Sequence, residues 1–385
     1  MRRKTKKRYI AVVGIIIFLF SACGRRMEHR DISGDISEQT STDAEKVVFP
    51  DRYETTEGKV VFSCDVLAPE SPALTSVTAS QIDFDYAGIR DCLIQDNEVI
   101  ETEIWEWDND KKTSVPGKLN VSKQDFEKNE YDYVLDNGAE LIVGTCGSWS
   151  EVIYMMPTNY ITDALNLGGE DEGYNGNLYK KNINFAFASQ EKTVSELKKI
   201  TSLYTGVNNT MQTVYCVDAD TLNENRVVSE QEEKGEEADI YTSEDDGYYI
   251  CMWQQLQGLP VYSREANYSI EYAGNAPIVA YYTENGWHDL RIEASRLYNF
   301  DVKGETIKLK QFEEIADVVF RYYDALLTDN TYEIYRATLY NYVTEDGTVT
   351  PVWIFKTYET YPDGNFRCDQ LDINAVTGEV FTIYD

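Results

Sequence analysis

The sequence predicts an α+β fold, in which a β-rich N-terminal domain precedes two units that each combine a helix with an antiparallel sheet. Tyrosine is unusually common, with 29 in 385 residues, and tyrosine favours half-buried sheet surfaces. Apolar residues alternate at period two through much of the chain, which is typical of strands. Two segments instead repeat apolar residues at three- and four-residue steps, which indicates helices.

The region 47–185 is expected to form mixed sheet with few helices. A strand is predicted over Lys59–Leu67. The runs Tyr131–Leu135 and Ala139–Val143 flank an Asn-Gly turn, the strongest local signal for a β-hairpin, because both turn residues tolerate positive φ. The segment Ser80–Cys92 holds a short alternating stretch but also fits a short helix, and the pattern leaves both interpretations open.

Two helices define the later units. The first is predicted to begin at Thr193, which forms a capping box with Glu196, and to end at Gly206. The second covers Lys310–Leu327 and carries one apolar face. Strands follow each helix, at Thr213–Val217 and Tyr248–Gln254 in the first unit and at Tyr332–Tyr342, Val352–Thr357, Phe366–Ile373 and Glu379–Tyr384 in the second.

The domain organisation follows from these elements and from shifts in composition. An acidic insert interrupts the first unit and is expected to be a solvated loop. The expected segments are a signal peptide at 1–22, a flexible tether at 23–46, the β-rich domain at 47–185, the first unit at 186–300 with its insert at 223–246, and the second unit at 301–385.

The N-terminus has the pattern of a secretory leader. A basic head ending at Arg8 precedes the apolar run Ile10–Phe20, which is too short to span about 30 Å of hydrocarbon. Leu19-Phe20-Ser21-Ala22-Cys23 resembles the lipobox of bacterial lipoproteins. The resemblance implies cleavage, diacylation of Cys23 and attachment to the membrane on its outer side. A plain signal peptide and an uncleaved anchor are the alternatives.

Net charge limits the classes of partner. The chain carries −32, and removal of the six basic residues of the leader leaves 29 basic against 67 acidic residues, or −38. Such a surface repels phosphate backbones, which argues against nucleic-acid binding. It also repels anionic headgroups, so membrane attachment is expected to depend on the acyl chains. Cationic partners are attracted, although solubility alone also explains an acidic surface.

The last 75 residues or so contain a helix through Phe312–Leu327, then Pro351–Phe355, then Asp372–Val380. This order resembles a YycI-type extracytoplasmic regulatory domain and, more loosely, a PepSY domain. Over a longer span the chain resembles uncharacterised lipoproteins of Gram-positive bacteria. The resemblance implies a domain that binds or inhibits a protein partner outside the membrane, and it assigns no catalytic residue to this chain.

Cysteines beyond Cys23 form no CxxC pair, which excludes zinc-ribbon and thioredoxin-type sites. Their even number in an exported chain is compatible with disulfides and with free buried thiols. If disulfides form, Cys216–Cys251 is the first expected pair, because the two residues lie in neighbouring predicted strands. The six residues are Cys64, Cys92, Cys146, Cys216, Cys251 and Cys368.

The chain offers few candidates for a nucleophile paired with a histidine base. His29 lies in the tether, so His288 is the only histidine in the body of the chain. The residues around Cys146 partly match the papain signature, and His288 follows at a compatible distance, but the second cysteine of the signature is absent. Cys146 also follows a β run instead of starting a helix, so a turn after a buried strand is favoured.

Carboxylates offer weaker candidates. A sugar site around Trp105 and Trp107 is one hypothesis, and a strand with one buried face is the favoured alternative. Two acidic triplets contain oxygen ligands for calcium, but neither completes an EF-hand loop, so surface loops are favoured. The residues concerned are Glu103, Glu106 and Asp108 for the sugar, and Asp108-Asn109-Asp110 and Glu244-Asp245-Asp246 for calcium.

Together these patterns predict a lipid-anchored extracytoplasmic binding or regulatory protein, with no catalytic, cofactor or metal residue assigned. The expected partners are the membrane, through the lipid on Cys23, and a protein or peptide outside the cytoplasm. Two alternatives remain open: a cell-surface hydrolase of glycan or peptide that uses a carboxylate pair, and a structural component of the envelope.

Overall fold

A computed structural model of the chain describes residues 47–118, 124–147, 149–156, 178–180, 182–225, 240–262 and 276–381. The predicted leader, Cys23, the tether with His29, and residues 226–239 of the acidic insert lie outside these ranges.

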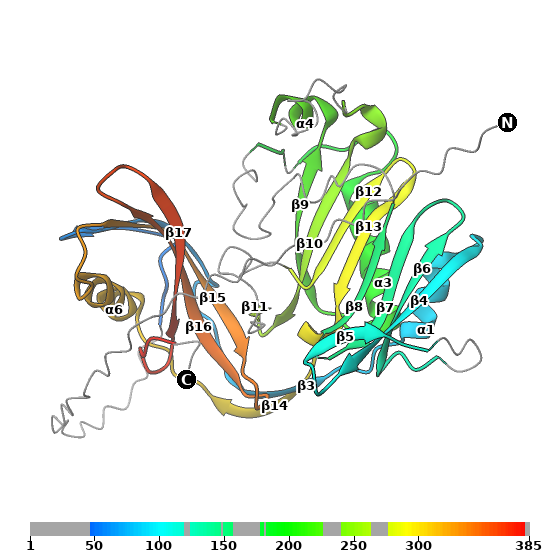
Figure 1. Ribbon diagram of the computed structural model, residues 1–385. Helices are drawn as coiled ribbons and strands as arrows, with labels where there is room; N and C mark the ends of the chain where they lie inside the picture. Colours follow the sequence, from blue (N-terminus) through cyan, green and yellow to red (C-terminus); the bar gives the residue numbers. More distant parts are fainter. Residues whose placement is uncertain are drawn as a thin grey trace. The chain divides into compact units, whose positions relative to one another are not determined.

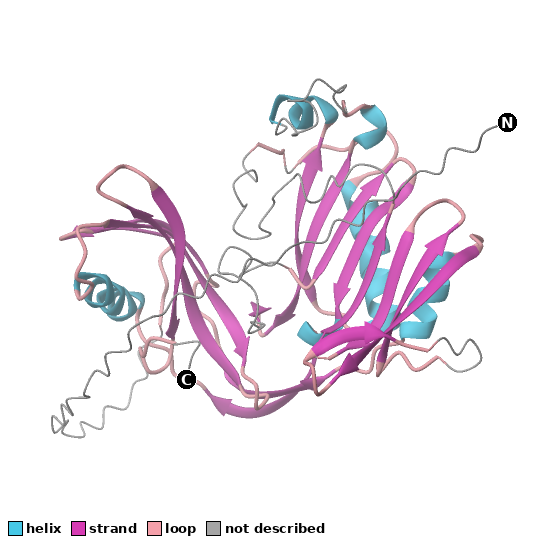
Figure 2. Ribbon diagram, in the orientation of Figure 1, coloured by secondary structure: helices cyan, strands magenta, loops and turns pink. Residues whose placement is uncertain are grey.

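The fold is mostly β, and the prediction of an α+β fold with two helix-plus-sheet units was wrong (Figure 2). Fifteen of the described strands join in one sheet, and β14 (Tyr298–Thr306) pairs with β3 (Thr75–Gln81) in a second (Figure 1). The long path of the large sheet runs through β1 (Arg52–Glu57), β2 (Val60–Leu67), β15 (Thr331–Val343), β11 (Leu259–Tyr262), β10 (Gly247–Leu256), β12 (Ile278–Thr283), β13 (Gly286–Glu293), β8 (Trp149–Met155), β7 (Glu140–Cys146), β6 (Asn129–Leu135), β4 (Val99–Asp108) and β5 (Thr113–Pro116). Off this path, β16 (Val349–Thr360) pairs with β15 and β17 (Phe366–Asn374), and β9 (Thr210–Val217) pairs with β10.

Long-range pairing is the reason that the predicted units are not separate. β2, near the start of the body, pairs in parallel with β15, near its end. β13, expected in the first unit, pairs with β8 of the N-terminal region. The short strand β11 pairs with both β10 and β15. A sequence pattern reports that a segment is a strand but not which distant strand it pairs with, so these connections were not predicted.

Two helices cover one face of the part of the sheet that runs from β4 to β10. They are α1 (Tyr86–Ile94) and α3 (Gln190–Thr205). Ile89 of α1 and Leu197 of α3 are fully buried in a core with the inward residues of these strands. α3 begins one turn before the expected Thr193, because Ser189 caps it by accepting a hydrogen bond from the Lys192 amide at 3.2 Å. Its expected end at Gly206, which adopts φ 72°, is confirmed.

A third helix, α6 (Phe312–Asp324), packs on β2, β15, β16 and β17 and confirms the second predicted helix. Phe312 contacts the rings of Trp353 and Phe355 on β16, and Phe320 contacts Phe62 of β2. The other described helices are α4 (Ala219–Asn225) and two single 3₁₀ turns, η2 (Ser243–Asp245) and η4 (Ala294–Arg296). Within the described ranges, every helix is too short or too polar to cross a membrane.

Local turn chemistry was the most reliable sequence signal. The Asn-Gly hairpin is confirmed as β6 and β7, with Gly138 at φ 86°. The ambiguous segment Ser80–Cys92 holds both the end of β3 and the start of α1, which Asp85 caps by accepting from the Gly88 amide at 2.9 Å. Of the expected strand Glu379–Tyr384, a single bridge between Val380 and Ile373 is present, and positions from 382 onward lie outside the described residues.

The six described cysteines are all free thiols. The proposed Cys216–Cys251 disulfide is incompatible with the strand register, in which Cys216 lies opposite Tyr248 and Cys251 opposite Thr213. Cys216 also belongs to the core under the helices and Cys251 to a separate core on the other face. Because side chains three residues apart in register point to opposite faces of a sheet, these two thiols cannot reach each other.

Candidate binding face

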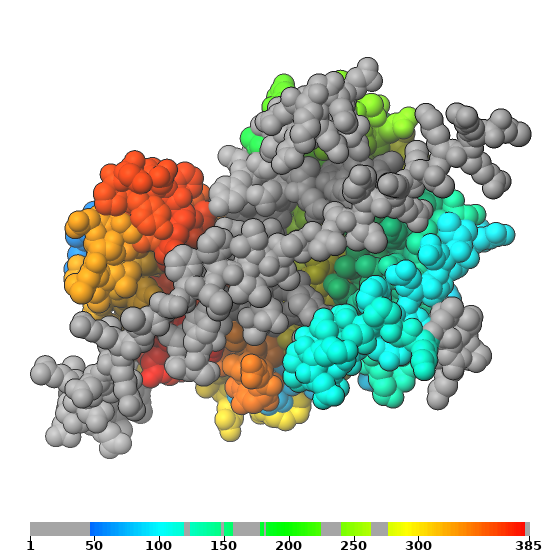
Figure 3. All heavy atoms as spheres, in the orientation of Figure 1, coloured from blue at the N-terminus to red at the C-terminus, as the bar shows by residue number. Residues whose placement is uncertain are grey.

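The strands β4, β6, β7, β8 and β13 present a face that none of the described helices covers, here called the helix-free face. Their alternate residues, such as Tyr131, Leu141 and Val152, are buried against α1 and α3 on the opposite side. In Figure 3, residues of β4 and β5, in cyan and turquoise, lie at the molecular surface on the side shown. By register, the helix-free face consists of Glu101, Glu103, Trp105, Glu130, Asp132, Val134, Glu140, Ile142, Gly144, Glu151, Ile153, Met155, Asp289, Arg291 and Glu293.

One row across this face holds three glutamates. Trp105 lies opposite Glu130, Glu130 opposite Gly144, Gly144 opposite Glu151, and Glu151 opposite Glu293. Glu130 and Glu151 are therefore two strand spacings apart, about 9.5 Å between Cα atoms, with no side chain between them. Gly144 has φ 134°, and a Cβ there would overlap the Asn129 carbonyl oxygen, so only glycine fits this position.

The next two rows mix apolar residues with acids. Val134, Ile142, Ile153 and Met155 lie on adjacent strands and are half-buried. Glu140 lies between Val134 and Met155 in its row, and the other acids of these rows are Glu101, Glu103, Asp132 and Asp289.

Burial and neighbouring carboxylates disfavour the ionised forms of two acids on this face, Glu130 and Asp132. Burial raises the pKa of Glu130 to about 7, and the carboxylates of Glu151 and Asp132 add to the rise. Burial also raises the pKa of Asp132 to about 6, with further contributions from Glu140 and from the acids of β4. One carboxylate oxygen of Asp132 is inaccessible and accepts no hydrogen bond from any described residue. These two acids therefore lack a positive partner within the described part of the chain.

Positive charge on this face is confined to its β13 side. Arg291 makes ion pairs with Glu151 at 3.3 Å and with Glu293 at 3.2 Å. Arg296, just after β13, pairs with the other oxygen of Glu293 at 3.1 Å. The sequences of β4, β6, β7 and β8 contain no lysine or arginine. The described face therefore has a neutralised end and an end with excess negative charge.

Cys146 and His288 are not brought together. Cys146 lies opposite position 149, at the start of β8, and its thiol contacts the Ser114 hydroxyl at 3.4 Å. His288 lies beyond the other end of β8, where its carbonyl accepts a hydrogen bond from the Met156 amide. Seven residues of strand separate the two sites by about 24 Å. The His288 ring instead bonds its neighbour Asp289 at 2.7 Å.

The acids around the tryptophans of β4 do not converge either. Glu103 and Trp105 share the helix-free face, whereas Glu106 and Asp108 have the opposite parity on the strand. Glu106 accepts a bond from the Lys118 amide at 3.4 Å, and Asp108 accepts amide bonds within its own turn. Only Glu103 of the three acids considered for a sugar site therefore belongs to the helix-free face, and the favoured interpretation was a strand with one buried face.

The two acidic triplets proposed for calcium have partners within the chain. Asp108 forms an ion pair with Lys111 at 2.9 Å. Asp246 accepts the Ala219 amide at 2.8 Å at the start of α4, and Asp245 forms a capping box with Thr242. Within the described ranges, no group of three or more potential ligands is placed to hold a metal ion.

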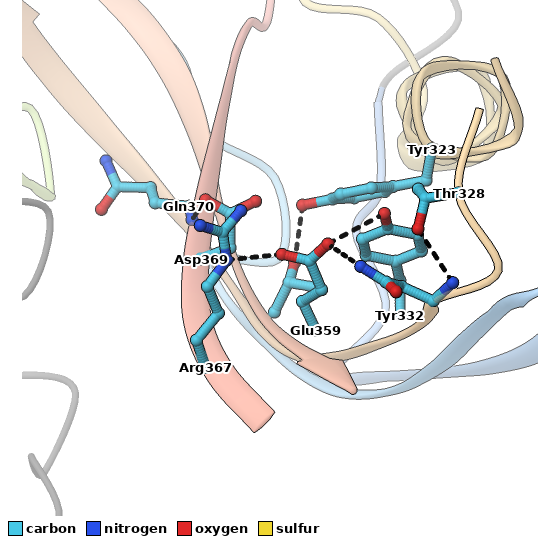
Figure 4. Close-up of polar contacts among 9 residues, drawn as sticks. Tyr323, Thr328, Tyr332, Glu359, Arg367, Asp369 and Gln370 are labelled. Carbon is cyan, nitrogen blue, oxygen red and sulfur yellow. Dashed lines mark hydrogen bonds and ion pairs between the residues drawn. The ribbon is translucent and has the colours of Figure 1, made fainter. Parts of the chain in front are cut away.

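A second polar cluster lies between α6 and β16 (Figure 4). Glu359 is 5% exposed and accepts hydrogen bonds from the Asn330 amide at 2.6 Å, the Tyr332 hydroxyl at 3.1 Å and the Arg367 guanidinium at 2.5 Å. Burial opposes ionisation of Glu359, but the bonds from Asn330 and Arg367 outweigh it and lower its pKa. The same carboxylate, together with burial, raises the pKa of Tyr332 to about 12.

The carboxylate of this cluster is satisfied by the chain itself, because both oxygens of Glu359 accept hydrogen bonds from it. Tyr323 reaches from α6 to donate to the Thr357 hydroxyl at 3.1 Å, and both residues are fully buried (Figure 4). This bond holds the end of α6 on the sheet.

Sequence reasoning did not select Glu130, Asp132, Gly144, Glu151 or Arg291. A local signal was present in β6, where Glu130 and Asp132 flank buried Tyr131 and so must share one face. The neighbours of that face come from β7, β8 and β13, and their register could not be read from the sequence.

No family model matches the chain, and no curated protein matches it. Among solved structures, it is similar to an uncharacterised protein from Eubacterium rectale ATCC 33656, with a TM-score of 0.56 and 15% sequence identity. The similarity covers 87% of this chain and 94% of the other. At this identity the similarity concerns the fold alone.

Proposed function

We propose that the protein is a lipid-anchored extracytoplasmic binding protein without catalytic activity, and that its binding surface is the helix-free face. Export and anchoring rest on the leader and the lipobox-like residues before Cys23. A regulatory role rests on the resemblance of the C-terminal region to YycI-type and PepSY domains.

The observation that carries this proposal is the composition of the helix-free face. An antiparallel sheet with one face in the core normally exposes polar residues on the other face. Here Val134, Ile142, Ile153 and Met155 lie half-buried on that face, and acids lie beside and between them. Neighbouring apolar residues on an otherwise polar surface are typical of a protein interface.

Photo-cross-linking on living cells tests the position of this surface. Benzoylphenylalanine is placed at position 142, on the helix-free face, and at exposed Asp317 of α6 as a control. The proposal predicts a discrete cross-linked partner from position 142 and none from position 317. The same products from both positions, or none from position 142, would contradict it.

One observation favours a second candidate, a glycan hydrolase. Glu130 and Glu151 face each other across Gly144, and Glu130 has the raised pKa of a general acid. The register puts their Cα atoms about 9.5 Å apart on one face, and inverting glycosidases use two facing carboxyl groups about 6.5–9.5 Å apart. Release of reducing sugar from cell-wall glycan by the purified full chain, abolished by Glu130→Gln but not by Glu305→Gln on β14, would establish this function.

A further inference from the structure

We propose that the helix-free face docks an extended cationic segment of a partner protein, in which basic and apolar side chains follow one another on the same face of the segment. This inference rests on the proposed function and adds the chemical class of the partner.

Charge complementarity is the first argument. Glu130 and Asp132 lie on the helix-free face, and four of its five strands, β4, β6, β7 and β8, supply no basic side chain. Arg291, the guanidinium on the neighbouring strand, already pairs with Glu151 and Glu293. Glu101, Glu103 and Glu140 are exposed on the same face, and lysine or arginine from outside would supply the positive charge that these strands lack.

The order of side chains along the strands is the second argument. β7 presents Glu140, Ile142 and Gly144 to this face, and β8 presents Met155 and Ile153 beside the first two and Glu151 beside Gly144. Same-face residues of a strand are about 6.8 Å apart, and an extended partner has the same spacing. A segment lying along β7 would therefore place a basic side chain near Glu140 and an apolar one on Ile142 and Ile153.

The probe for this inference is a nine-residue peptide, Lys-Thr-Leu-Thr-Lys-Thr-Leu-Thr-Lys, which alternates Lys and Leu on one face. Its affinity for the full chain in detergent micelles is measured by fluorescence anisotropy. One control peptide replaces each Lys by Glu, and another replaces each Leu by Ser. We expect binding of the probe, no binding of the Glu peptide, and weaker binding of the Ser peptide.

Two matched triple variants locate the binding site, because each removes three exposed carboxylates and changes the net charge equally. The first, on the helix-free face, should weaken probe binding about tenfold at about 50 mM salt, and the second should leave it unchanged. The helix-free triple is Glu101→Gln, Glu103→Gln and Glu140→Gln, and the control triple is Glu305→Gln, Asp317→Asn and Asp324→Asn. Ile142→Ser tests the apolar contact and should weaken binding of the Leu peptide more than binding of the Ser peptide.

Equal weakening by both triples would show attraction to net charge alone and would overturn the inference, as would absence of probe binding. Failure of this inference can be distinguished from failure of the proposed function. If the probe does not bind but position 142 still cross-links a partner on cells, the surface is correct and the partner is not cationic. If position 142 cross-links nothing, the surface itself is wrong.

Discussion

Replacing Glu130 by glutamine should stabilise the fold at alkaline pH. The folded chain raises the pKa of Glu130 from 4.5 to about 7, so its charged form is disfavoured after folding. That difference corresponds to roughly 3 kcal/mol at 1.36 kcal/mol per pKa unit, and solvent screening of this half-buried group reduces it to about 1–2 kcal/mol. Glutamine keeps the shape of the side chain and removes the charge.

The sign of the pH dependence follows from the direction of the shift. Between pH 4.5 and about 7 the folded chain holds a proton on Glu130 that the unfolded chain has lost, so this group's contribution to stability falls as pH rises. The advantage of Glu130→Gln should therefore be full above pH 7 and vanish near pH 4.5. Urea unfolding of both proteins at a series of pH values measures the difference, and Glu305→Gln on exposed β14 is the matched control. A variant less stable than wild type at pH 8, or a difference that does not change with pH, would refute the reasoning.

Other predictions concern Glu359 in the polar cluster, Gly144 on the helix-free face, and lipid anchoring through Cys23. Glu359→Ala should lower the free energy of unfolding by about 1–3 kcal/mol, because it leaves the buried Asn330 amide and Tyr332 hydroxyl without their acceptor, and urea unfolding measures the loss. Because the folded pKa of Glu359 is lowered, its contribution is present above pH 4.5 and is lost as pH falls below it, so the deficit of the alanine variant should shrink in acid. Gly144→Ala should lower the free energy of unfolding by at least about 2 kcal/mol more than Gly304→Ala does. Position 304 also has positive φ, but a Cβ there would meet no other atom within 4 Å. Cys23→Ala should move the protein from the membrane fraction to the soluble fraction, and retention of the variant in the membrane would contradict lipid anchoring.

Local features of the fold could be predicted because their causes are local. The hairpin at Gly138 depends on the φ values of two turn residues, and the end of α3 depends on Gly206. The apolar face of α6 is also visible in the sequence, because its buried residues recur with the helical period.

The architecture could not be predicted, because its causes are distant in sequence. The parallel pairing of β2 with β15 joins segments about 270 positions apart, and no residue in either strand identifies the other. The same limit applies to the binding face. Glu130 and Glu151 become neighbours only through the register of β6, β7 and β8, and Glu293 joins them only because β13 pairs with β8. The period-two alternation of apolar residues predicts the strands, but it does not indicate which of their carboxylates share a row.

The most direct test of the account is amide hydrogen exchange of the full chain with and without the Lys-Leu probe. We expect the probe to slow exchange in β6, β7 and β8 while leaving β15, β16 and β17 unchanged. Slower exchange confined to β15–β17, or no change in any strand at saturating probe, would show that the helix-free face is not the surface that binds the probe.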